Sequence, residues 1–146
     1  MRKLVLGLVL LASVSVSAQI ELVETEQSEV VGKISYVYLE KIGDNEYNFF
    51  YKNINAIGHE YVNFSFKNLD NDLDKLYQIL MKGFEDVPRD PLKMKANGEI
   101  VWLKYSREDG EAFLQIQQTE GDGSSENAVK VSRLLTKEDI TQLFKK

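Results

Sequence analysis

The chain has 146 residues, with 23 acidic and 18 basic side chains and a formal net charge of −5. This acidic balance argues against nucleic-acid binding and against a polybasic membrane surface, both of which need clustered positive charge. The chain has no cysteine, so disulfides and thiolate chemistry are excluded. Its length suits one domain, and a hydrophobic share of 43% is sufficient for a core.

The first eighteen residues follow the pattern of a secretory signal peptide. Arg2 and Lys3 precede an apolar run at 4–11, and a segment of small residues ends at Ala18. The apolar run is shorter than the about 20 residues that span a bilayer as a helix. We therefore expect export to the periplasm or the extracellular space, with no integral membrane segment after cleavage. An N-terminal anchor or a buried strand is the alternative.

The next segment, 19–29, is rich in Glu and has no regular period, so we predict a flexible N-terminal segment followed by a single domain at 30–146. Alternating β-branched and aromatic residues then predict strands at 30–42, 46–52 and 60–67. The turn signal Gly43-Asp44-Asn45 joins the first two strands into a hairpin.

Residues 69–84 predict the main amphipathic helix, and we expect it to pack across one face of the sheet. Asn68 or Asp70 is the expected N-cap, Gly83 is expected to weaken the last turn, and Pro88 and Pro91 prevent continuation. The apolar side chains recur at spacings of three and four: Leu69, Leu73, Leu76, Leu80 and Phe84.

The second half of the chain returns to strands, predicted at 92–96, 99–106, 112–119 and 127–135. Asn97-Gly98 is a strong hairpin signal between the first two of them. A short C-terminal helix is predicted at 137–144, with Thr136 as its N-cap and Asp139 placed as in a capping box. The expected fold class is α+β: a mostly antiparallel sheet of about six or seven strands, one main helix and a short C-terminal helix.

A weak internal similarity lies at an offset of 67 positions. It predicts a βββα pseudo-repeat, with one extra strand in the second half, arranged about a closed two-fold. The alternative is that any strand leading into a capped amphipathic helix gives similar matches. The matched pairs are Val62 and Val129, Ser65 and Ser132, Asp72 and Asp139, Leu73 and Ile140, Leu76 and Leu143, and Tyr77 and Phe144.

The motifs for metal and catalytic chemistry are weak, and we predict no catalytic residue, cofactor or metal site. His59 is the single histidine and is expected to be solvated at a strand edge. The spacing of Asp70, Asp72 and Asp74 resembles the start of a calcium loop, but the required Gly and Glu are missing from it. The acidic loop at 120–126 is expected to be mobile, with a calcium site as the less favoured alternative.

The aromatic residues of the first strands are the strongest candidates for a functional surface. These strands are apolar on both faces, so either both faces are covered or one aromatic face is exposed. Core packing, with tyrosine hydroxyls in water, is the competing interpretation. The candidate binding surface consists of Tyr36, Tyr38, Tyr47, Tyr51 and Tyr61.

We predict a small exported, non-enzymatic protein that acts by binding another protein or an envelope component. One alternative is a carboxylate-based hydrolase of cell-wall or polysaccharide material, which would need two facing carboxylates in a cleft. The other is a structural protein that self-associates through Tyr36 and Tyr38. Together with the signal peptide, residues 69–77 and 134–144 resemble small exported bacterial proteins, and this resemblance implies no activity.

Overall fold

The computed structural model describes residues 27–120 and 124–146. The predicted signal peptide, residues 19–26 of the predicted flexible segment and the centre of the acidic loop lie outside these residues. The elements are β1 (Ser28–Ile34), β2 (Val37–Ile42), β3 (Glu46–Lys52), β4 (Tyr61–Lys67), α2 (Asp72–Asp86), β5 (Leu92–Ala96), β6 (Glu99–Glu108), β7 (Glu111–Gln118), the 3₁₀ turn η1 (Ser125–Asn127), β8 (Lys130–Val131) and α3 (Lys137–Leu143).

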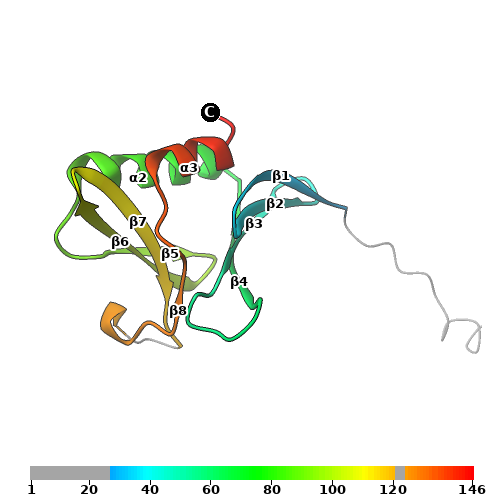
Figure 1. Ribbon diagram of the computed structural model, residues 1–146. Coiled ribbons are helices and arrows are strands. Elements are labelled where there is room, and N and C mark those ends of the chain that lie inside the picture. The colour runs from blue at the N-terminus through cyan, green and yellow to red at the C-terminus, as the bar shows by residue number, and fades with distance from the viewer. Residues whose placement is uncertain (1–26, 121–123) are drawn as a thin grey trace, which may run out of the picture.

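The strands form two antiparallel four-stranded sheets, each a simple meander in chain order. The N-terminal sheet contains β1–β4 and the C-terminal sheet contains β5–β8. Figure 1 shows the sheets diverging beneath the two helices, which lie side by side. The α+β class is confirmed, although eight strands in two sheets replace the expected six or seven in one. Each half has the same order, four antiparallel strands followed by a helix.

The additional strand arises because the segment predicted as one strand at 30–42 is a tight hairpin. Ile34 pairs with Val37 across the turn Ser35–Tyr36, and Tyr36 has a left-handed φ of 64°. A bulky residue with positive φ is an outlier, so the sequence carries no ordinary turn signal at this position. The predicted flexible segment also extends too far, because β1 begins at Ser28.

The predicted strand at 127–135 is largely irregular, and only β8 pairs regularly with β7. Beyond β8, the Ser132 hydroxyl accepts a hydrogen bond from the Ile116 amide at 2.9 Å, and this side-chain bond replaces a backbone ladder bond. The Ser132 amide still donates to Ile116 O at 2.8 Å, and the next bridge pairs Leu114 with Leu135. A serine side chain that bonds to the backbone therefore shortens the strand.

Helix α2 begins at Asp72, three residues later than predicted, and this leaves Leu69 outside the helix and 70% exposed. The N-cap is Asn71, with a left-handed φ of 58° and no side-chain capping bond, so the expected choice of Asn68 or Asp70 is wrong. Asn68 still contributes, because its Oδ1 accepts a hydrogen bond from the Leu73 amide at 3.0 Å. The helix continues past Gly83 to Asp86, two residues further than predicted.

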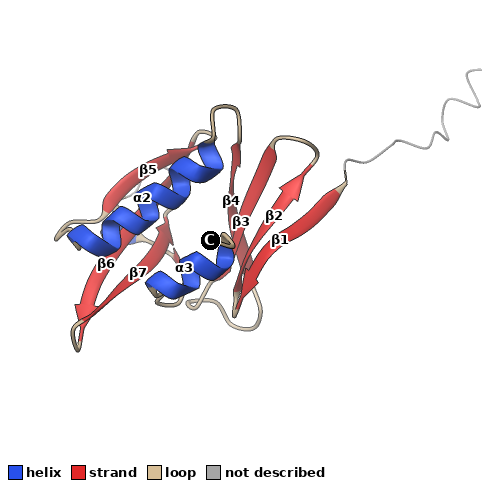
Figure 2. Cartoon of the chain, turned by 90° about the horizontal axis from the view of Figure 1, so that it is seen from above, coloured by secondary structure: helices blue, strands red, loops and turns tan. Residues whose placement is uncertain are grey.

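The two helices are exchanged between the halves. Helix α2 follows the N-terminal sheet but packs on β6 and β7, whereas α3 follows the C-terminal sheet and packs on β1 and β2. The approach of α3 is close, because a β-carbon on Gly32 of β1 would overlap the Leu143 carbonyl. The view from above in Figure 2 shows both helices on the same side of the sheets.

One hydrophobic core joins the two halves. Tyr51 is fully buried, and its hydroxyl donates a hydrogen bond to Gln118 Oε1 at 2.6 Å, which links β3 to β7. The largest fully buried side chains come from both sheets and both helices: Tyr51, Phe49, Phe64, Leu39, Leu80, Leu103, Leu114, Ile116, Leu135, Ile140, Leu143 and Val37.

Candidate functional site

The candidate site is the outer face of the N-terminal sheet, opposite the core. Tyr38 of β2 and Phe50 of β3 are direct cross-strand partners. Their rings stack with centroids 4.6 Å apart and planes inclined by 13°. Tyr61 of β4 extends the cluster, with its ring centroid 5.7 Å from that of Tyr38. We call Tyr36, Tyr38, Phe50 and Tyr61 the aromatic face.

Tyr36 lies at one end of this face, and its own backbone is strained. Its φ of 64° is unusual for a bulky residue, and its side chain is 48% exposed. Two long-range hydrogen bonds fix the turn: the Lys52 amide donates to Tyr36 O at 2.9 Å, and Arg133 Nε donates to Ser35 O at 2.8 Å. Lys52 Nζ lies 4.7 Å from the centre of the Tyr36 ring. Backbone strain that the surroundings maintain in this way is common at functional sites.

The structure brings together three of the five predicted site residues, Tyr36, Tyr38 and Tyr61. Tyr47 and Tyr51 are 8% and 0% exposed and belong to the core, so placing them on a binding surface was wrong. They share the inner face of β3, where alternate residues are buried. The prediction missed Phe50, although its position between two buried aromatics already assigned it to the opposite face.

The surroundings of the aromatic face are polar. Burial raises the pKa of the Tyr38 phenol, and nearby Glu40 and Tyr61 raise this pKa further, so the hydroxyl stays neutral and can donate at neutral pH. Asn63 Nδ2 donates to Asn48 Oδ1 at 3.1 Å on the same face. Lys33, opposite Tyr38 on β1, is exposed. The face therefore has an apolar centre within a polar and charged margin.

A polar groove of about 700 Å³ adjoins the aromatic face where β4 meets the C-terminal sheet. Tyr61 belongs to both features, and Asn63 lines the groove beside it. Glu99, Glu120 and Lys130 contribute charged side chains to the opposite side of the groove. Two carboxylates thus line one groove, which is one part of the arrangement that the predicted hydrolase would need.

The other sequence motifs do not assemble into a site. His59 is exposed, in the loop between β3 and β4 rather than on a strand. Asp72 and Asp74 lie in the first turn of α2, and Asp72 Oδ2 accepts a hydrogen bond from the Leu69 amide at 3.1 Å. In the described ranges, no three His, Cys, Asp or Glu side chains are grouped so that they could hold a metal ion. The described helices are all too short or too polar to cross a membrane.

Comparisons with protein-family models, with curated proteins and with solved structures found no match to this chain.

Proposed function

We propose that this chain is an exported, non-enzymatic binding protein that holds a protein partner of the cell envelope or secreted fraction on its aromatic face. The observation that carries the proposal is the position of Tyr38, Phe50 and Tyr61 on the sheet face opposite the core, where Tyr61 is 39% exposed and Tyr38 and Phe50 are half-buried. The signal-peptide pattern at residues 1–18 supports export.

The ring geometry favours a protein partner over a sugar. A sugar ring stacks on a free aromatic face, but Tyr38 and Phe50 each turn one face toward the other. The Tyr36 ring has the Lys52 ammonium group over it. The ring edges and the tyrosine hydroxyls remain available, and these groups suit the mixed apolar and polar contacts of protein interfaces, where Tyr and Phe are enriched.

The aromatic face is also ordered in advance. Ring stacking and the bonds that hold the Ser35–Tyr36 turn restrict the side chains and backbone that would make contact. Side chains that are already restricted lose little conformational entropy when a partner binds. Large, rigid aromatic groups of this kind commonly supply most of the binding free energy of an interface.

The test compares binding by the wild-type protein with binding by the double variant Tyr38→Ala/Tyr61→Ala. A partner isolated from envelope and secreted fractions would be purified and titrated calorimetrically against both proteins. We expect the double variant to bind at least ten-fold more weakly, since two interface anchors are removed. The matched control, Leu69→Ala/Leu92→Ala, removes two exposed apolar residues elsewhere and should leave the affinity unchanged. Equal binding by all three proteins would contradict the proposal.

Light scattering at high concentration tests a second copy of the chain as the occupant of the aromatic face. If the wild type is a dimer and the Tyr38→Ala/Tyr61→Ala variant is a monomer, the aromatic face binds a second copy of the chain and not a separate partner. A monomer in both proteins would support a separate partner.

A second candidate function is carboxylate-based hydrolysis, which the shared position of Glu99 and Glu120 in the polar groove favours. The purified protein would be incubated with peptidoglycan and polysaccharide substrates, beside the variants Glu99→Gln and Glu120→Gln. Turnover by the wild type that either variant abolishes would establish this candidate in place of the binding function. We expect no turnover by any of the three proteins.

A further inference from the structure

A second concave site lies away from the aromatic face, between β4, β5 and α2. It is a groove of about 400 Å³, a volume within the ~300–1,000 Å³ that small-molecule sites occupy. Phe64 and Phe66 line it from β4, Leu76 and Ile79 from α2, and Met94 and Ala96 from β5. We call it the lysine-rimmed groove, after the side chains described below.

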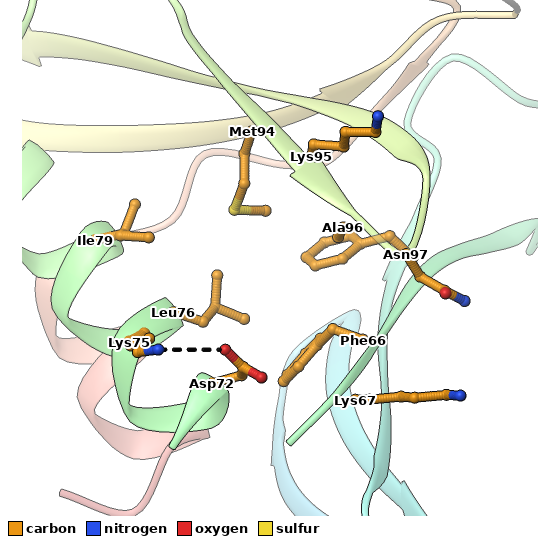
Figure 3. A pocket seen from close by; sticks show the side chains of 11 residues that line it. Phe66, Lys67, Asp72, Lys75, Leu76, Ile79, Met94, Lys95, Ala96 and Asn97 are labelled. Atoms are coloured by element: carbon orange, nitrogen blue, oxygen red, sulfur yellow. Dashed lines mark ion pairs between the residues drawn. The ribbon is translucent and has the colours of Figure 1, made fainter. Parts of the chain in front are cut away.

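The interior of this groove is apolar. Figure 3 shows Met94, Ile79, Leu76 and Phe66 arranged around an open space. Ile79 is 44% exposed, although the other face of its helix is buried. Protein interiors are normally packed without such gaps, and an accessible apolar hollow is a place where a hydrocarbon chain can bind.

The mouth of the groove is basic. Lys67, Lys75 and Lys95 contribute three ammonium groups, and Asp72 is the one carboxylate that lines the groove in the described part of the chain. Three lysines and one aspartate give the lining a net charge of +2, whereas the whole chain has a charge of −5. Lys67 and Lys95 extend away from the hollow in Figure 3, so their charges lie at its margin. Lys75 lies 3.8 Å from Asp72 but is 61% exposed.

We infer that the lysine-rimmed groove binds a free fatty acid, with the hydrocarbon chain in the apolar hollow and the carboxylate at its basic margin. The apolar interior selects a hydrocarbon chain, and the local positive charge on an acidic protein selects an anionic head group. Each added methylene should raise the affinity roughly fourfold until the hollow is filled. This site is independent of the aromatic face and of the proposed partner.

The test is direct titration of the full chain with fatty acids of increasing length, read by displacement of a dansyl-labelled undecanoic acid. Dodecanoate should displace the probe better than dodecanol, and dodecyltrimethylammonium should be the weakest competitor. No displacement by dodecanoate, or equal displacement by the cationic chain, would overturn the inference. Displacement by a lysophospholipid but not by dodecanoate would also overturn it.

Two variants locate the site. Lys67→Ala/Lys75→Ala/Lys95→Ala changes only exposed side chains and should weaken dodecanoate at least ten-fold while leaving dodecanol unchanged. Ile79→Glu places a negative charge at the hollow and should weaken both ligands, dodecanoate more than dodecanol. The control Lys33→Ala/Lys104→Ala/Lys137→Ala removes three exposed lysines elsewhere and should bind like the wild type. If the control loses as much dodecanoate affinity as the first triple variant, the lysine-rimmed groove is not the site.

Discussion

At the scale of single residues, Gly83 determines how α2 meets the C-terminal sheet. The Tyr105 ring of β6 occupies the space where a β-carbon on Gly83 would lie. The Tyr105 hydroxyl donates to Leu80 O at 2.7 Å, and its ring meets Phe84 edge to face at 5.3 Å. Burial raises the pKa of the Tyr105 phenol well above its usual value, so this hydroxyl remains a donor at neutral pH.

We predict that Gly83→Ala destabilises the protein, although alanine is the better helix former. The added methyl group must displace the Tyr105 ring, and overpacking of this kind costs about 1–3 kcal/mol. The free energy of unfolding would be measured by urea titration, with the single Trp102 as the fluorescent reporter. Gln78→Ala, on the exposed face of the same helix, is the control and should change stability little. A Gly83→Ala variant as stable as wild type would show that the ring moves aside without cost.

Single residues of β3 also show which part of the candidate site could be predicted from the sequence. Alternation along β3 correctly separates Phe50 from Tyr47 and Tyr51, because successive side chains of a strand point to opposite faces. When both faces of a strand carry aromatic residues, the alternation of its side chains does not show which face is covered by the core. That choice depends on α3 and the C-terminal sheet, which lie far away in sequence.

At the scale of elements, α3 behaves as its sequence predicts. Thr136 Oγ1 accepts a hydrogen bond from the Asp139 amide at 3.1 Å, and Asp139 Oδ2 accepts one from the Thr136 amide at 3.0 Å. Arg133 Nη1 donates to the same carboxylate oxygen at 3.1 Å. A capping box uses only neighbours in sequence, so it can be predicted from a short segment. The hairpin of β1 and β2 could not be predicted, because long-range bonds hold its turn.

We predict that Asp139→Asn lowers the free energy of unfolding by about 1 kcal/mol at pH 7. Partial burial alone would raise the pKa of Asp139, but the bonds from Thr136 and Arg133 outweigh it and lower this pKa below 3.8. A carboxyl whose pKa falls on folding stabilises the protein above its unfolded-state pKa, and this contribution disappears as the pH falls through the folded-state pKa. The difference between wild type and variant should therefore shrink below pH 3.8.

Urea titrations at neutral and acidic pH would measure this difference. Glu138→Gln removes the same charge from an exposed position in the first turn of α3 and serves as the control. If Asp139→Asn lowers the free energy of unfolding no more than the control does, the role of the Asp139 carboxylate in the capping box is contradicted.

At the scale of the whole molecule, the exchange of helices joins the two halves. The sequence predicts that each helix has an apolar face, but this pattern does not specify which sheet the face will contact. Two close contacts between a helix and the sheet of the opposite half are Gly83 with Tyr105 and Gly32 with Leu143. The fold class was therefore predictable, whereas the division into two sheets and the exchange were not.

We predict that neither half folds alone and that the two halves restore the fold when mixed. Fragments 27–88 and 89–146 would each lack the helix that covers their own sheet. Circular dichroism should show disordered fragments that gain native secondary structure on mixing, and Trp102 fluorescence should return to that of the intact chain. A folded fragment 89–146 by itself would contradict this prediction. Intact protein nicked after residue 88 is the control and should remain folded.

The hydrogen bond from Arg133 to Ser35 joins groups 98 positions apart in the sequence. The turn of the first hairpin is therefore stabilised by a residue that lies just before α3. Folding that depends on such distant contacts is slow, because much chain entropy is lost before the stabilising contacts form. As the chain is made from its N-terminus, β1–β4 emerge long before α3. The apolar face of the N-terminal sheet therefore stays uncovered until α3 has been made. Such a chain stays unfolded for longer after synthesis. A delay in folding is compatible with the export that we propose, because a chain that is still unfolded can be threaded across a membrane.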